Sequence, residues 1–88
     1  MYMKVNFHKH FHKNYNKLTD REHLKFKERL ALLCADEFNP LLNNHALHGK
    51  YSGYRSISIA GNLRAIYKHR GPDAISFVAI GSHSALYG

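Results

Sequence analysis

The sequence contains few of the residues that staple small proteins together or anchor them in membranes. Cys34 is the single cysteine among 88 residues, which excludes an intramolecular disulfide and a cysteine-based zinc cluster. This scarcity suits a reducing compartment, so we expect a cytoplasmic protein. No long apolar run is present, and no charged stretch precedes a short apolar one, so we expect neither secretion nor contact with a membrane. The length predicts one domain, residues 1–88.

Acidic residues are scarce as well. Six Asp and Glu oppose 13 Lys and Arg, which gives a formal net charge of +7 with histidine neutral. A surplus of this size in a short chain favours a polyanionic partner, either nucleic acid or an acidic protein. The alternative is that lysine-rich helix surfaces serve only solubility.

The first half of the sequence has mainly helical periodicity. Residues 2–7 alternate as a short strand does, and apolar residues then recur at helical spacing, which predicts a helix over about 9–18. Thr19 and Glu22 have the spacing of a capping box, so a second helix should begin near residue 20. Pro40 is expected to end that helix, and Cys34 lies on its apolar stripe as a core residue.

The second half predicts three strands, over 54–59, 63–69 and 74–82, joined by short turns. The element order β-α-α-β-β-β indicates an α+β fold, with a helical hairpin packed on one face of a mainly antiparallel four-stranded sheet. The other face should be open and basic, suited to phosphates, because polar and cationic side chains share it. These are Ser56, Ser58, Arg64 and Lys68.

Several residues near this face are candidates for chemistry. His83 suits proton transfer near neutral pH, and Tyr87 suits base stacking or hydrogen bonding. The alternative is a terminal cap, in which Tyr87 packs into the core and His83 is only solvated. Arg64 suits the extra negative charge of a phosphorane, and Arg55, of opposite parity, reaches the rim only if it emerges at the strand's start. His45 lies in a loop rich in Gly, Asn and Ser, where proton transfer, substrate binding or plain solvation all fit.

Two groups of histidines have the spacing of metal ligands but lack the additional ligands that a metal site needs. His45 and His48 lack a third and fourth ligand at a recognisable spacing. The stretch HKHFH at 8–12 has no acidic or cysteine neighbour, so we interpret it as a solvated first helical turn. The sequence therefore predicts no metal site and no cofactor.

Two stretches resemble the RelE/ParE superfamily of bacterial toxins from type II toxin–antitoxin pairs, with the YafQ branch as the nearest likeness. They are LHGKYSGYRSISIAGNLRAIYK, from Leu47, and IGSHSALYG, from Ile80. The resemblance implies a RelE-like fold and a metal-independent endoribonuclease that enters the ribosomal A site and cuts mRNA. In that reaction the RNA's 2′-hydroxyl attacks the adjacent phosphate, leaving a 2′,3′-cyclic phosphate and a 5′-hydroxyl.

The resemblance also implies residue roles and partners. His83 and His45 match histidines of the YafQ branch's active site, Arg64 matches a phosphate-stabilising arginine, and Tyr87 matches a terminal aromatic residue that contacts or orients the substrate. We expect further substrate contacts from Arg55, Lys50, Lys68 and Ser58. The implied partners are an acidic antitoxin, mRNA on the 70S ribosome, and promoter DNA through the antitoxin only.

The sequence departs from the YafQ pattern at several positions. Ser58 stands where that branch has a histidine, Asn62 and Leu63 replace an Asp-Trp pair, and Ala79 replaces an arginine. Two alternatives therefore stay open: a ParE-like toxin that inhibits DNA gyrase by binding it, and an RNA-binding domain without turnover.

Overall fold

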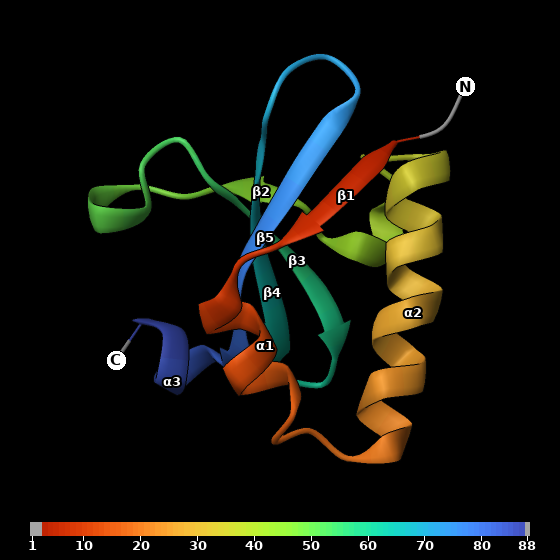
Figure 1. Cartoon of the computed structure of the whole chain (residues 1–88), viewed down its shortest axis with the longest axis vertical. Coiled ribbons are helices and arrows are strands. Elements are labelled where there is room, and N and C mark those ends of the chain that lie inside the picture. The colour runs from red at the N-terminus through yellow and green to blue at the C-terminus, as the bar shows by residue number, and fades with distance from the viewer. Residues whose placement is uncertain (1–2, 88) are drawn as a thin grey trace.

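A mixed five-stranded sheet forms the centre of the computed structural model, which describes residues 3–87 (Figure 1). Its strands are β1 (Lys4–Phe7), β2 (His45–Ala46), β3 (Arg55–Ala60), β4 (Leu63–His69) and β5 (Ala74–Ser82). They lie in the order β1-β5-β4-β3-β2, with β1 parallel to β5 and every other pair antiparallel. The predicted α+β class is confirmed, and the two-residue β2 adds a fifth strand to the four expected.

Three helices accompany the sheet: α1 (Lys9–Tyr15), α2 (Asp20–Ala35) and the terminal α3 (His83–Tyr87). Two short 3₁₀ turns, η1 (Pro40–Leu42) and η2 (Gly49–Tyr51), lie in the connection from α2 to β3. The predicted capping box is confirmed. The backbone N–H of Glu22 donates to Thr19 Oγ1 at 3.1 Å, and the N–H of Thr19 donates to Glu22 Oε1 at 2.9 Å. This reciprocal pair satisfies two backbone donors and fixes where α2 begins.

Several predicted boundaries were wrong. The first strand was expected over 2–7 but is described from Lys4, and Tyr2 lies outside the described residues. The first helix ends at Tyr15 instead of residue 18, because the chain must turn before Thr19 caps α2. Helix α2 ends at Ala35, ahead of the EFNP stretch, and Pro40 begins η1, where its missing N–H costs no hydrogen bond.

The main core lies between the sheet and the first two helices. Helix α1 packs against β5, and α2 packs against β3. Phe26 and Leu33 of α2 are almost fully buried there. Cys34, predicted to be a core residue, is exposed. One residue along a helix is a rotation of about 100°, so Cys34 turns away from the sheet that Leu33 contacts.

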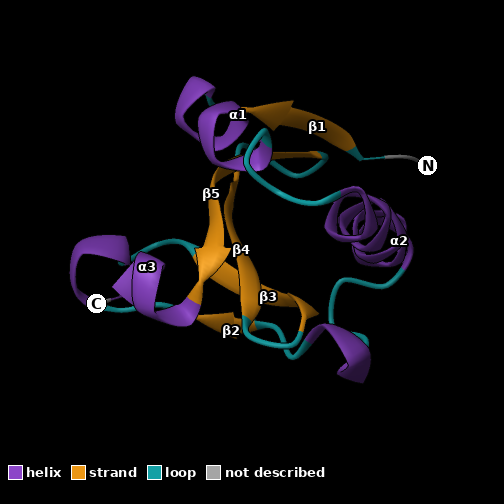
Figure 2. Cartoon of the chain, turned by 90° about the horizontal axis from the view of Figure 1, so that it is seen from below, coloured by secondary structure: helices purple, strands orange, loops and turns teal. Residues whose placement is uncertain are grey.

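The second face of the sheet is less open than the sequence predicted. Figure 2 shows α3 on one side of β3, β4 and β5, with α2 on the other side. Under α3, Ile66 of β4, Ala79 of β5 and Leu86 of α3 form a small second core, flanked by partly buried aromatic residues. Ile66 and Ala79 would otherwise expose apolar surface to water, so α3 covers this part of the face and leaves the polar residues around it.

Candidate active site at the end of strand β4

Arg64 lies near the start of β4, opposite Ser58 of β3 and Gly81 of β5. Its Nε donates to Ser56 Oγ at 2.6 Å, and one terminal nitrogen donates to the carbonyl oxygens of Asn43 at 3.0 Å and Ser56 at 3.2 Å. All three acceptors are neutral. Within residues 3–87 no carboxylate forms an ion pair with Arg64, so its charge remains available to an anion.

His45 of β2 is exposed beside this guanidinium. Its Nδ1 lies 3.4 Å from a terminal nitrogen of Arg64 and 3.2 Å from the carbonyl oxygen of Asn43. Arginine can only donate and a carbonyl can only accept, so the tautomer decides which of the two contacts is a hydrogen bond. Either way Nδ1 is occupied by the protein, which orients the ring. Nε2 of this exposed residue has no hydrogen-bond partner among residues 3–87 and is free for proton transfer.

His83 and Tyr87 form a second group, at the two ends of α3. Their ring centroids are 4.8 Å apart, and the backbone N–H of His83 donates to the carbonyl oxygen of Asn62 at 3.1 Å. The Tyr87 hydroxyl is buried and has no hydrogen-bond partner among the described residues.

The two groups flank the same end of β4. Arg64 pairs with Gly81, two residues before His83, while Asn62, two residues before Arg64, holds the His83 backbone. The structure thus brings the predicted cation and both predicted histidines to one end of the sheet, although no direct side-chain contact joins His83 to Arg64 within the described part of the chain.

Three of the predicted substrate contacts lie on the same face as Arg64. Ser58 is directly opposite it, and Lys68 is four residues along β4 with its Nζ 4.9 Å from the Tyr54 ring centroid. Lys50 of η2 holds its Nζ 5.3 Å from the Tyr51 ring centroid. Both lysines therefore sit beside aromatic rings, the combination that single-stranded nucleic acid binds through phosphates and bases.

Arg55 is on the opposite face, as strand parity requires, and the structure does not bring it to the candidate site. Its Nε donates to Asn44 Oδ1 at 2.7 Å, and its guanidinium lies 5.1 Å from the Phe38 ring centroid. The proposed role of Arg55 in substrate binding therefore has no geometric support.

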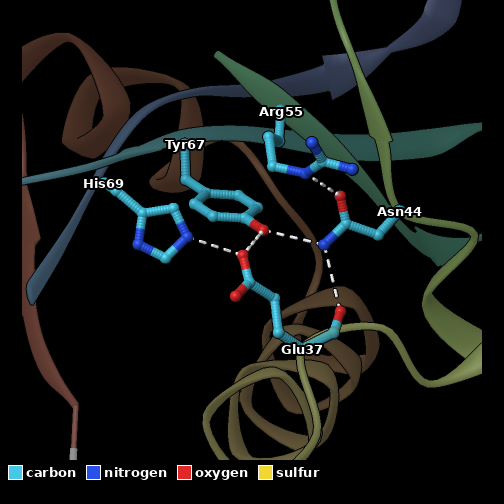
Figure 3. Close-up of polar contacts among 5 residues, drawn as sticks. All are labelled: Glu37, Asn44, Arg55, Tyr67 and His69. Atoms are coloured by element: carbon cyan, nitrogen blue, oxygen red, sulfur yellow. Dashed lines mark hydrogen bonds and ion pairs between the residues drawn. The ribbon is translucent and has the colours of Figure 1, made fainter. Parts of the chain in front are cut away.

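Arg55 instead belongs to a polar network that holds the segment before His45 (Figure 3). The Tyr67 hydroxyl and the His69 Nε2 each lie 2.7 Å from Glu37 Oε2, and Asn44 Nδ2 donates to the Glu37 carbonyl oxygen at 3.0 Å. Asn44 Nδ2 also donates to the Tyr67 oxygen at 2.7 Å. Asn44 lies between Asn43, whose carbonyl accepts from Arg64, and His45, whose ring lies beside Arg64. The network therefore holds the backbone that positions both residues.

Protonation states in the network follow from burial and these contacts. Burial, and then the hydrogen bond to Glu37, raise the pKa of Tyr67 well above its usual range, so the phenol remains a donor. Burial alone would raise the pKa of Glu37, but the hydrogen bonds from Tyr67 and His69 and the nearby positive charges outweigh it. The pKa of Glu37 is therefore lowered, and the carboxylate remains ionised.

Asn43 and Ser56 were not among the predicted site residues, yet they hold Arg64. Ser56 shares strand parity with Ser58, which was the available signal, and it is 0% exposed in the structure. Asn43 acts through its backbone carbonyl in a left-handed conformation (φ 44°), for which side-chain identity gives little sign. In residues 3–87 no three His, Cys, Asp or Glu side chains are grouped to hold a metal ion. Across the same residues, the helices lack the length and apolar character that a bilayer span requires.

Comparisons with solved structures agree with this fold. YafQ from E. coli strain BL21(DE3) superposes with a TM-score of 0.83 at 22% identity, covering 98% of this chain and 99% of that one. A chain of the E. coli DinJ–YafQ toxin–antitoxin complex gives 0.81 at 23% identity over 100% of both chains. A chain of the RelB–RelE antitoxin–toxin complex from Methanococcus jannaschii gives 0.74 at 23% identity, covering 94% and 95%. The RelE-like fold is thereby confirmed.

The family relationship rests on sequence. No curated protein matches the chain significantly. However, the sequence model of a family described as bacterial toxin of type II toxin–antitoxin system, YafQ, matches residues 3–88. The match includes both stretches that carry Arg64 and His83. The chain therefore belongs to the YafQ family of bacterial toxins from type II toxin–antitoxin systems.

Proposed function

We propose that this toxin is a ribosome-dependent endoribonuclease that cuts mRNA in the ribosomal A site without a metal ion. The observation that carries the proposal is the Arg64 guanidinium, which is held only by neutral oxygens and has the His45 ring 3.4 Å away. His83 lies at the same end of β4. A cation with one imidazole beside it and a second at the same end of the sheet matches the needs of RNA self-cleavage.

The chemistry requires a base, an acid and a cation. One imidazole accepts the proton of the 2′-hydroxyl as its oxygen attacks the adjacent phosphorus. Arg64 stabilises the negative charge that accumulates on the phosphorane oxygens. The P–O5′ bond then breaks while the other imidazole donates a proton to the departing 5′-oxygen, which leaves a 2′,3′-cyclic phosphate and a 5′-hydroxyl. His45 and His83 share the acid and base roles, and the ring of Tyr87 beside His83 orients that imidazole.

The partners follow from charge and family. The formal net charge of +7 suits an acidic antitoxin that covers the basic surface and releases the toxin when it is degraded. The E. coli and M. jannaschii relatives are seen in complexes with the antitoxins DinJ and RelB. For this chain we infer the same kind of pairing in the cytoplasm, with promoter DNA bound through the antitoxin.

The test is cleavage of mRNA on programmed 70S ribosomes, followed by mass analysis of the new RNA ends. His83→Ala and His45→Ala should each lower the single-turnover rate by about 10²–10⁴-fold, the range for loss of a general acid or base. Arg64→Ala should lower it by about 10²–10³-fold, as loss of one charge-stabilising donor does elsewhere. The wild-type products should carry cyclic phosphate ends.

His12→Ala and Arg21→Ala are the matched controls, because both side chains are exposed on α1 and α2, outside the candidate site. They should cut at the wild-type rate. If well-folded wild-type protein cuts nothing but inhibits DNA gyrase in a supercoiling assay, the protein is a ParE-like binding toxin and the nuclease proposal is wrong.

A further inference from the structure

A basic groove lies beside the candidate active site, and none of the catalytic roles above uses it. It has a volume of about 390 Å³ and runs between the start of α1, the η2 turn and the β4–β5 hairpin, with Val78 and Ala79 of β5 as its floor. Its polar and aromatic lining comes from His8, His10, Lys50, Tyr51, Tyr54 and Arg70. We propose that this groove binds the single-stranded RNA that continues from the cutting site, through its phosphates and bases.

The ionisable side chains that line the groove, apart from its two tyrosines, are all basic. Asp73, in the β4–β5 turn, is the single acidic residue between Phe38 and Gly88, and the other five lie between Asp20 and Glu37. No carboxylate pairs with Lys50 or Arg70 among residues 3–87. His8 Nδ1 accepts the backbone N–H of His10 at 3.1 Å, which places the proton of the neutral ring on Nε2 as a further donor. Unpaired cations and outward donors are what a phosphate chain requires.

Aromatic rings connect the groove to the candidate active site. Tyr51 lies 6.1 Å from Tyr54, which also lines the groove, and 6.2 Å from Tyr87 in α3, measured between ring centroids. Figure 1 shows that η2 and α3 lie on the same side of the strands, away from α2. A strand whose bases stack along these rings passes from His83 to the groove without leaving the protein surface.

Only the far end of the groove lies well away from Arg64. Arg64 and Arg70 are six residues apart along β4 and its turn, which is about 20 Å at the rise of a strand. Ala79, at the near end of the floor, pairs with Ile66, two residues from Arg64. The Arg70 end of the groove must therefore contact phosphates further along the RNA than the scissile one. We expect it to supply affinity and register for the strand, with no part in the chemical step.

The double variant Lys50→Gln/Arg70→Gln tests this inference, which depends on the proposed function for the identity of its ligand. Binding of a fluorescein-labelled dodecanucleotide RNA is measured by anisotropy in the His83→Ala background, where the RNA stays intact. The double variant should raise Kd by about tenfold and reduce the slope of log Kd against log salt by about 1.4, since each lost phosphate contact on a single strand is worth about 0.7. On programmed ribosomes it should raise KM and leave kcat unchanged.

The matched control is Lys17→Gln/Arg21→Gln, which removes the same two charges from exposed positions at the turn into α2. It should bind RNA within about twofold of the parent protein. If the groove variant binds and cuts like this control, or if the parent protein does not bind the strand, the groove is not an RNA site. If RNA binding depends on the groove but wild-type protein cuts nothing, the groove is confirmed as an RNA-binding site and the nuclease proposal is wrong.

Discussion

The hydroxyl of Tyr87 is buried without a partner among the described residues, whereas its ring packs against His83 and Tyr51. An unpaired buried hydroxyl costs free energy, so Tyr87→Phe should leave the free energy of unfolding unchanged or raise it by up to about 1 kcal/mol. Because the ring, not the oxygen, lies beside His83, cleavage should stay within about twofold of wild type. Urea unfolding and single-turnover cleavage measure both quantities. A loss of more than tenfold in cleavage with intact stability would show that the hydroxyl itself meets the substrate.

Single residues were predictable from sequence where strand parity decides their side. Parity placed Arg64 and Lys68 on the face of the candidate site, and the structure has them there. Sequence periodicity was a poor guide where neighbouring elements decide the contacts and exposure of a side chain. Cys34 belongs to a helical stripe by spacing but turns out to be exposed, and Arg55 finds Asn44 and Phe38 on the far face. The carbonyl of Asn43, which holds Arg64, has no signature in the side-chain pattern because a backbone group makes the contact.

The segment between α2 and β3 is the element that carries His45, and Glu37 anchors it to β4. Because the pKa of Glu37 is lower in the folded protein, its carboxylate stabilises the fold above about pH 4.5, the ordinary value. That contribution disappears as the pH falls through the lowered pKa. Glu37→Gln should therefore be less stable than wild type at pH 6, and the difference should shrink towards pH 3.

Urea unfolding at several pH values measures this difference, with Glu28→Gln as the control. Glu28 is exposed on α2 and pairs with Lys25 at 3.6 Å, a surface contact worth little. A difference between wild type and Glu37→Gln that stays constant from pH 6 to pH 3 would show that ionisation of Glu37 does not stabilise the segment.

Elements were predictable where local chemistry marks them. The capping box at Thr19 fixed the start of α2, and the turn at Gly61, with φ of 53°, separates β3 from β4 as the sequence suggested. Non-local pairing escaped prediction: β1 lies parallel to β5, about seventy residues away in the chain, and β2 exists only because His45 and Ala46 pair with β3. The cover that α3 gives to Ile66 and Ala79 escaped it for the same reason.

The whole molecule has two sides of different character. On the side of α2 lie five of the six acidic residues, interspersed with lysines and arginines, while the side with α3 carries Arg64, Lys68 and the basic groove. A field of this kind accelerates the approach of a polyanion to one side of a protein more than net charge alone would. We therefore expect the proposed antitoxin and the proposed RNA substrate to compete for the same side of the molecule.

Two charge reversals separate this asymmetry from net charge. Lys68→Glu on the α3 side and Lys27→Glu on α2 each lower the formal net charge of +7 by two. At low salt, Lys68→Glu should slow the association of a labelled oligoribonucleotide by about tenfold, because the reversed charge lies with Arg64 on the proposed RNA-binding face. Lys27→Glu should slow it by less than about twofold, and the two rates should converge as salt screens both charges. Stopped-flow fluorescence over a range of salt concentrations measures these rates. Equal slowing by both variants would mean that the toxin attracts RNA through its total charge, and that the face carrying Arg64 has no directing effect.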